Sequence, residues 1–125
     1  MYHPASQSAA EFAAAGRGFD KEDYEFLELQ NVSPSLTVNL RGVRFSAGIE
    51  LTLGDLSVAP GERVVLVRNL AAFANRYGSG PRVAGVYGNE TNPDLDGKLS
   101  NSGERIQLLD PLGGVVLDFA YQDFW

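Results

Sequence analysis

The sequence contains no cysteine, and it has one histidine, one methionine and one tryptophan among 125 residues. Without cysteine the chain has no disulfides, zinc–thiolate sites or thiol nucleophiles. A Ser–His–Asp triad would have to use His3, which stands beside Pro4 near the terminus. We interpret His3 as a partly exposed histidine at a strand end, and this shortage of reactive side chains predicts a non-catalytic chain.

The sequence also lacks a long apolar run and an excess of basic residues. No stretch approaches the ~20 apolar residues of a transmembrane helix, and no basic region followed by an apolar stretch marks a signal peptide. The formal net charge is −6 and the arginines are scattered, whereas binding to the phosphate backbone of a nucleic acid needs clustered basic residues. We therefore expect neither membrane insertion nor nucleic-acid binding.

What the chain does contain is enough for one β-rich domain. Hydrophobic residues make up 44% of the sequence, which suffices for a single core at this length. From Tyr24 onward, short apolar runs alternate with glycine, proline, asparagine and aspartate, as in an all-β domain. In the expected strand Tyr24–Val32, Leu27 and Leu29 fall on one face and polar residues on the other.

The same alternation predicts the rest of the fold. Further strands are expected at 38–45 with a bulge at Gly42, and at 49–53, 63–68, 83–86, 105–108 and 115–121. Residues 59–62 suit a type II turn, strand 63–68 is apolar enough to be central, and residues 110–114 close a final hairpin. Asn69 and Gly78 suit the two ends of one short helix, with Leu70, Phe73, Ala74 and Tyr77 on one face. The pattern predicts a β-sandwich with one short helix.

Residues 5–23 differ in composition from the rest of the chain. They are rich in alanine, serine and glycine, and Ala9–Ala15 precedes Gly16-Arg17-Gly18. We expect a mobile insertion here, with room for a single helical turn over Ala9–Ala15.

Several segments, in their order and spacing, carry a family resemblance. They are Glu25–Asn31, Leu40–Val43 with Phe45, Leu56–Leu66, Ala72–Gly78, Gly97–Asp110 and Asp118–Trp125. Together they resemble the lamin-tail domain, although Val43 stands where many members carry tryptophan. The resemblance implies an immunoglobulin-like sandwich. In nuclear lamins this domain is a protein-interaction module, and bacterial relatives are accessory domains of large exported proteins, often beside hydrolase domains.

The resemblance also bears on the ends of the chain. Met1-Tyr2-His3-Pro4 resembles part of the family's first strand, and Trp125 its last residue. We therefore expect residues 1–125 to be a single domain belonging to a larger protein, extracellular or at the cell surface.

One loop is a candidate metal site. Asn92, Asp94 and Asp96, followed by Gly97, match the first half of an oxygen-rich calcium loop. The twelfth position is Gly103 where the motif needs glutamate, and such loops are commonly solvated turns. A shift in thermal unfolding at millimolar calcium would support the site.

A pair of carboxylates could indicate a glycosidase, and Glu28 and Glu104 are the candidates. Each has a simpler interpretation, since Glu28 lies on the outer face of its strand and Glu104 begins another strand.

The leading hypothesis for the function is a non-catalytic module that binds a protein or a surface polymer whose identity the sequence does not give. The alternatives are a calcium-stabilised adhesion or carbohydrate-binding module, and an accessory domain of a hydrolase. A free edge strand would also permit weak homodimerisation.

Overall fold

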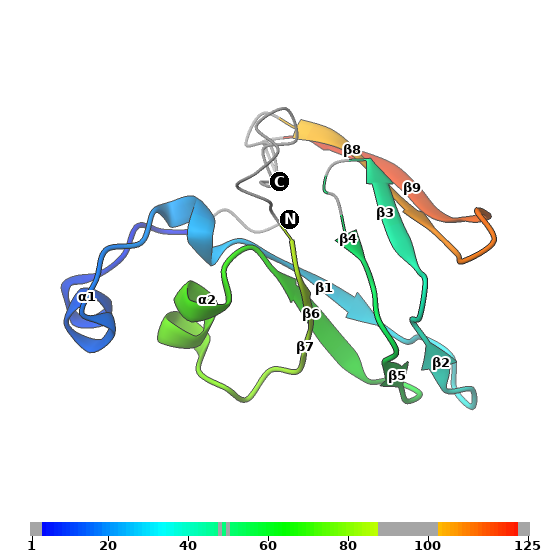
Figure 1. The fold of residues 1–125 in the computed structure, drawn as a ribbon, viewed down its shortest axis with the longest axis horizontal. Helices are drawn as coiled ribbons and strands as arrows, with labels where there is room; N and C mark the ends of the chain where they lie inside the picture. The colour runs from blue at the N-terminus through cyan, green and yellow to red at the C-terminus, as the bar shows by residue number, and fades with distance from the viewer. Residues whose placement is uncertain (1–3, 48, 50, 88–102, 123–125) are drawn as a thin grey trace.

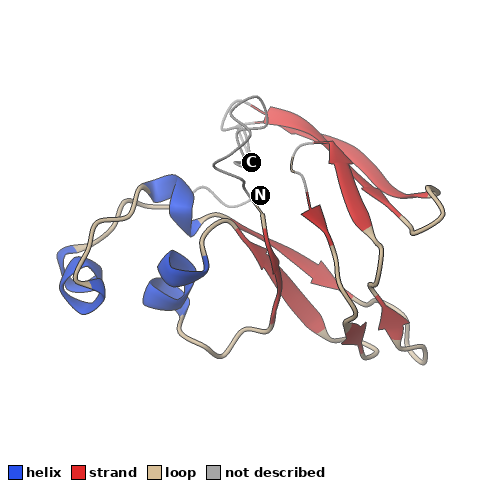
Figure 2. Ribbon diagram, viewed as in Figure 1, coloured by secondary structure: helices blue, strands red, loops and turns tan. Residues whose placement is uncertain are grey.

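The structure is a computed structural model that describes residues 4–47, 49, 51–87 and 103–122, and strands dominate it (Figures 1 and 2). The helical elements are α1 (Ala9–Ala15), the 3-10 turn η1 (Lys21–Tyr24) and α2 (Leu70–Tyr77). The strands are β1 (Phe26–Gln30), β2 (Val38–Asn39), β3 (Arg44–Ala47), β4 (Leu51–Thr52), β5 (Ser57–Val58), β6 (Arg63–Val67), β7 (Val83–Val86), β8 (Gly103–Leu109) and β9 (Val115–Gln122).

The strands form three sheets, which confirms the predicted β-rich fold. One sheet has the order β1-β6-β7, a second pairs β2 with β5, and the third has the order β4-β3-β8-β9. All the pairs are antiparallel except β6 with β7. Strand β6 is central to its sheet, as its apolar sequence predicts. Figure 2 shows the helices gathered at one end of the molecule.

Both larger sheets contribute to one apolar core. Phe45 from β3, Leu66 from β6, and Ile106 and Leu108 from β8 are all buried in a single cluster. Tyr87, which directly follows β7, joins this cluster and is fully buried. The predicted alternation is therefore confirmed around Phe45 in β3 and around Ile106 and Leu108 in β8. In β6 four consecutive residues, 64–67, are buried, as suits a central strand.

The described residues contain two α-helices, one more than the predicted single short helix, and the first has the bounds of the helical turn expected over Ala9–Ala15. Ser8 caps the first helix: its side chain accepts from the Glu11 N–H at 3.2 Å, and the Glu11 carboxylate accepts from the Ser8 N–H at 2.9 Å. Gly16, with φ +68°, ends the helix in the left-handed region. This reciprocal capping box at the start of an alanine-rich run explains why α1 forms beyond a single turn.

The second helix is the crossover that lets β7 run parallel to β6, since parallel neighbours cannot be joined by a tight turn. Asn69 caps it as predicted, accepting from the Ala72 N–H at 3.1 Å. Its buried residues are Ala72 and Phe73, whereas Leu70 is half-exposed and Ala74 is exposed, so the predicted apolar face is wrong at these two positions.

Gly42 also differs from its prediction. The Val43 N–H donates to the carbonyl of Leu40 at 3.0 Å, and Gly42 has φ +79°. This is a tight turn between β2 and β3, with glycine at its left-handed position, and it replaces the expected bulge. The apolar set after the turn is as predicted, because Val43 and Phe45 are buried. The turn at 59–62 is also as predicted, with Gly61 at φ +76° and a Glu62 N–H to Ala59 carbonyl bond of 3.0 Å.

Candidate binding groove

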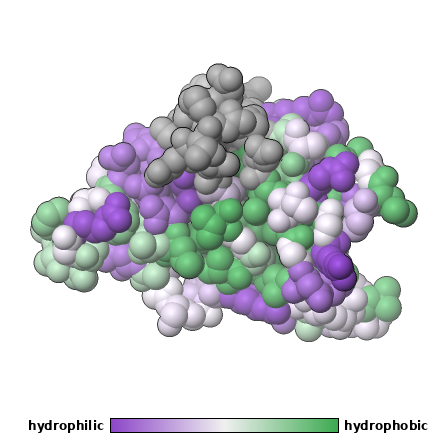
Figure 3. Space-filling view, viewed as in Figure 1, coloured by the Kyte–Doolittle hydropathy of each residue, from purple (hydrophilic) through white to green (hydrophobic). Residues whose placement is uncertain are grey.

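An apolar groove lies between β1 and β9, where the two larger sheets diverge. Two neighbouring pockets of 230 Å³ and 110 Å³ form it, and both are lined by Leu29, Leu108 and Leu117. The larger one is also lined by Gln30, Asn31, Val32, Val38, Leu40, Val58, Val64 and Val116, and the smaller by Leu27, Glu28, Phe45 and Ile106. In Figure 3 the outline is notched between the tip of the β8–β9 hairpin and the turns at β2 and β5.

The β9 side of the groove is only partly covered. Val116 and Leu117 are 53% and 48% exposed, and Val38 on the opposite wall is 41% exposed. Val38 and Leu40 alternate with polar residues, a pattern that predicts inward-pointing side chains at 38 and 40. The structure places Val38 on the wall of an open groove. Aliphatic side chains gathered in a concave site are typical of binding surfaces.

Asn31 holds one end of the groove in shape. Its side-chain amide donates to the carbonyls of Leu36 at 2.7 Å and Val58 at 2.9 Å, and its side-chain oxygen accepts from the Ser33 N–H at 3.0 Å. Because Asn31 is buried, these bonds fix the loop after β1 against β5. The groove wall around Val32 and Val38 is therefore built before any ligand arrives.

Replacing Asn31 with alanine should destabilise the protein by about 2 kcal/mol, because the buried bond to the Val58 carbonyl and the partly buried bond to the Leu36 carbonyl are both lost. Urea unfolding would measure the change. Asn39→Ala is the control, since its amide bonds to Asp55 at 2.6 Å but is exposed. A loss at Asn31 no larger than the loss at Asn39 would contradict this role.

Two charged residues of the hairpin that carries β9, Arg105 and Asp118, are paired with each other. The Arg105 guanidinium donates from Nε to Asp118 Oδ1 at 2.7 Å and from Nη2 to Oδ2 at 2.5 Å. This pairing, chiefly through the hydrogen bonds from Arg105, lowers the pKa of Asp118. In the register of β8 with β9, Leu117 lies opposite Leu108 and Asp118 opposite Gln107. Because successive side chains alternate, the charged pair lies on the face away from the groove.

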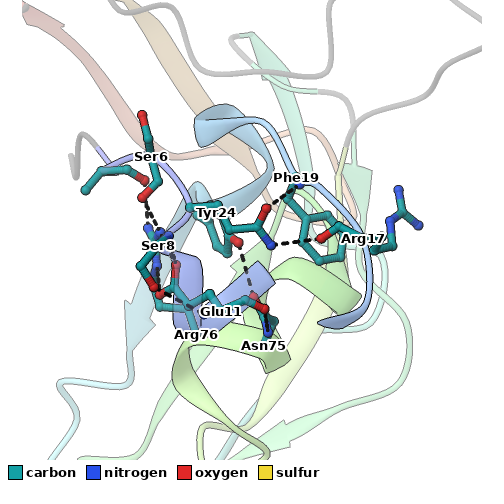
Figure 4. A network of polar contacts seen from close by, with 10 residues as sticks. Ser6, Ser8, Glu11, Arg17, Phe19, Tyr24, Asn75 and Arg76 are labelled. Atoms are coloured by element: carbon teal, nitrogen blue, oxygen red, sulfur yellow. Dashed lines mark hydrogen bonds and ion pairs between the residues drawn. The ribbon is translucent and has the colours of Figure 1, made fainter. Parts of the chain in front are cut away.

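A separate polar network, remote from the groove, ties the N-terminal arm (residues 4–20) to α2 (Figure 4). Arg76 Nε and Nη2 donate to the two carboxylate oxygens of Glu11 at 2.8 and 3.0 Å. The same guanidinium donates to the carbonyls of Ala5 and Ser6 at 3.0 and 3.1 Å, and it lies 3.6 Å from the centre of the Tyr24 ring. The Arg76 side chain thus connects α2 to the start of the arm, to α1 and to the Tyr24 ring.

The remaining contacts of the arm are also mainly polar. The Tyr24 hydroxyl donates to Asn75 Oδ1 at 3.2 Å, and the Asn75 amide donates to the Glu11 carbonyl at 3.0 Å. No residue of α1 is buried, and Phe12 is half-exposed. The segment expected to be a mobile insertion therefore contains a capped helix docked on α2, and hydrogen bonds rather than apolar burial hold it there.

The Glu11 carboxylate should make attachment of the arm sensitive to acid. The hydrogen bonds from Arg76, followed by the backbone bond at Ser8, lower the pKa of Glu11 from 4.5 to about 2. A carboxyl with a lowered folded-state pKa adds stability that is fully present above pH 4.5 and is lost as the pH falls towards 2. Hydrogen exchange in α1 should rise across this window in the wild type, relative to exchange in β6. In Glu11→Gln it should be raised already at pH 6 and change less; an identical profile in both proteins would contradict the role.

Most of the residues singled out in the sequence lie where the structure gives no description. Asn92, Asp94, Asp96 and His3 lie outside the described residues. Glu28 lies in β1 and Glu104 in β8, strands of different sheets. Glu28 is exposed, with its Oε1 3.8 Å from Arg63 Nε. Within the described ranges, no group of three His, Cys, Asp or Glu side chains could hold a metal ion.

Sequence reasoning missed the groove, although part of its signal was visible. Val115-Val116-Leu117 breaks strict alternation with three apolar residues in a row, and the register of β8 with β9 shifts at this point. The Arg76–Glu11 contact spans 65 positions and leaves no local pattern.

Neither of two comparisons with known proteins found a match to this sequence. No helix in the described part of the chain is long and apolar enough to cross a membrane. No protein-family model matches the sequence. No curated protein matches it either, so the lamin-tail resemblance stays a prediction.

Proposed function

We propose that the chain is a non-catalytic interaction module of a larger, exported or surface-exposed bacterial protein, and that the groove between β1 and β9 receives a protein partner. We further propose that its sheets form an immunoglobulin-like sandwich of the lamin-tail type. Support for the sandwich comes from the apolar cluster shared by the two larger sheets. Support for the module comes from the sequence, which offers one histidine and no cysteine for catalysis.

The observation that carries the proposed binding role is the exposed aliphatic wall at Val116 and Leu117. These side chains stand over a concave apolar surface and are not closed against it. Leaving them in water costs about 25 cal/mol per Å² of apolar surface that a partner could cover. A partner that fills the groove would gain this free energy, whereas the paired charges of the hairpin lie on the other face.

A selection from a library of displayed random peptides tests the proposed role. We expect saturable binders whose affinity falls at least about tenfold in Leu117→Asp, because a charge in the groove must be desolvated. Leu112→Asp is the matched control: Leu112 is 96% exposed at the tip of the same hairpin and does not line the groove. Thermal melting should show that both variants are folded, and Leu117→Ser gives a milder second substitution.

Two results would refute the groove as the binding surface. One is a library that yields no saturable binder to the folded wild-type chain. The other is a set of binders that lose affinity equally in Leu112→Asp and Leu117→Asp, since only Leu117 lines the groove.

A further inference from the structure

The free edge of β9 points to the conformation of the partner, an inference that rests on the proposed binding role. In the described part of the chain, β9 pairs with β8 and with no other strand. Its 8 residues, Val115–Gln122, include no proline, glycine or lysine. Natural proteins usually protect such an edge with proline, lysine, a bulge or a covering segment. The register shift of β9 lies at its start, between Val115 and Leu117, and the pairing is regular from Leu117 to Gln122. The one charged residue, Asp118, is already paired with Arg105.

The groove opens at the start of this edge, where Val116 and Leu117 line it, and it suits an extended segment. Its lining follows β1 from Leu27 and continues past the end of the strand to Val32, a span of about 17 Å at ~3.3 Å per residue. A strand added to β9 would continue the β4-β3-β8-β9 sheet. Every second side chain of that strand would then point into the groove, next to Leu117.

Charge distinguishes between the possible occupants. Because Leu27 and Leu29 line the groove, alternation turns the Glu28 side chain to the opposite face of β1, and the described side chains that point into the groove are uncharged. The chain as a whole carries −6. A second copy would bring another −6 against it, which disfavours association of two copies. A segment of another protein with neutral or basic outward residues meets no such repulsion, and basic residues are attracted by the net negative charge of the chain.

We propose that the β9 edge and the groove bind an extended segment of another protein by strand addition, with aliphatic side chains at alternate positions and lysine or arginine between them. Backbone hydrogen bonds to β9 would supply part of the affinity. The alternate aliphatic side chains would fill the groove and select the partner.

A synthetic peptide of about seven residues that alternates valine with lysine tests the strand addition. Two modified peptides carry N-methyl groups, one on the valine amides and one on the lysine amides. Alternate amides of a strand point to opposite edges, so each peptide loses the donors of one edge. We expect the unmodified peptide to bind, with one methylated form at least about tenfold weaker and the other nearly unchanged.

A third peptide replaces lysine with glutamate and tests the charge. It should bind several-fold more weakly than the lysine peptide at low salt, and the difference should shrink at about 1 M salt. Equal binding of the two methylated peptides, or of the lysine and glutamate peptides, would overturn the inference. So would no binding of the lysine peptide, or a dimer in light scattering that Leu117→Asp dissociates.

The outcomes separate this inference from the proposed function. If library peptides bind in a Leu117-dependent way while the two methylated peptides bind alike, the groove is a binding site without strand addition. If neither the library nor the lysine peptide binds the wild-type chain, both proposals fail.

Discussion

Replacing Leu66 with alanine should lower the free energy of unfolding by about 3 kcal/mol, because a buried leucine loses its contacts and leaves a cavity. Leu66 is 0% exposed and lies on the central strand β6, in the cluster to which both larger sheets contribute. Little of the resulting cavity can be refilled, since Phe45, Ile106 and Tyr87 are buried in the same cluster and anchored on separate strands or loops. Urea unfolding at neutral pH measures the effect.

Leu112→Ala is the matched control for this substitution. Leu112 is 96% exposed, so its truncation should change the free energy of unfolding by less than about 0.5 kcal/mol. A loss below about 1 kcal/mol in Leu66→Ala would show that the two sheets do not share a close-packed core. The peptide-binding surface would then lack a rigid wall.

Replacing Arg76 with alanine should detach the N-terminal arm while the sheets stay folded. The substitution removes the two bonds to Glu11, both bonds to the Ala5 and Ser6 carbonyls, and the contact with the Tyr24 ring. No apolar burial by α1 compensates for the loss. We expect trypsin to cleave after Arg17 at least roughly tenfold faster, because cleavage follows the open population of the arm.

Two further variants make this result specific. Arg76→Lys keeps the charge but loses the planar fork, so its cleavage rate should lie between those of the wild type and the alanine variant. Arg63→Ala removes an exposed arginine whose Nε is 3.8 Å from Glu28 and should leave the rate unchanged. An unchanged rate of cleavage after Arg17 in Arg76→Ala would contradict the proposal that Arg76 holds the N-terminal arm on α2.

Local features of the fold were predictable because they depend on neighbours in the sequence. Asn69 capping α2 and Gly61 closing its turn are both determined within a few residues. The alternation around Phe45 and Ile106 marked the buried faces because side chains alternate in any strand. The helix α1 was underestimated: the serine and glutamate of its capping box were visible, but the alanine-rich composition was interpreted as mobility.

Long-range features could not be predicted from patterns of this kind. The parallel pairing of β6 with β7 depends on how α2 packs, and the groove depends on how far β9 stands from β1. Val38 illustrates the limit: alternation places it on the apolar face but cannot say whether that face is closed. The calcium loop with Asn92, Asp94 and Asp96 lies outside the described residues and stays a prediction.

The central claim is that the groove between β1 and β9 is the binding surface, and NMR titration tests it most directly. The 15N-labelled chain is titrated with the valine–lysine peptide while the backbone amide shifts are recorded. The account predicts saturable shifts concentrated at residues 27–32 and 116–117, and their loss in Leu117→Asp but not in Leu112→Asp. Shifts confined to α2 and the N-terminal arm, or no shifts at millimolar peptide, would contradict it.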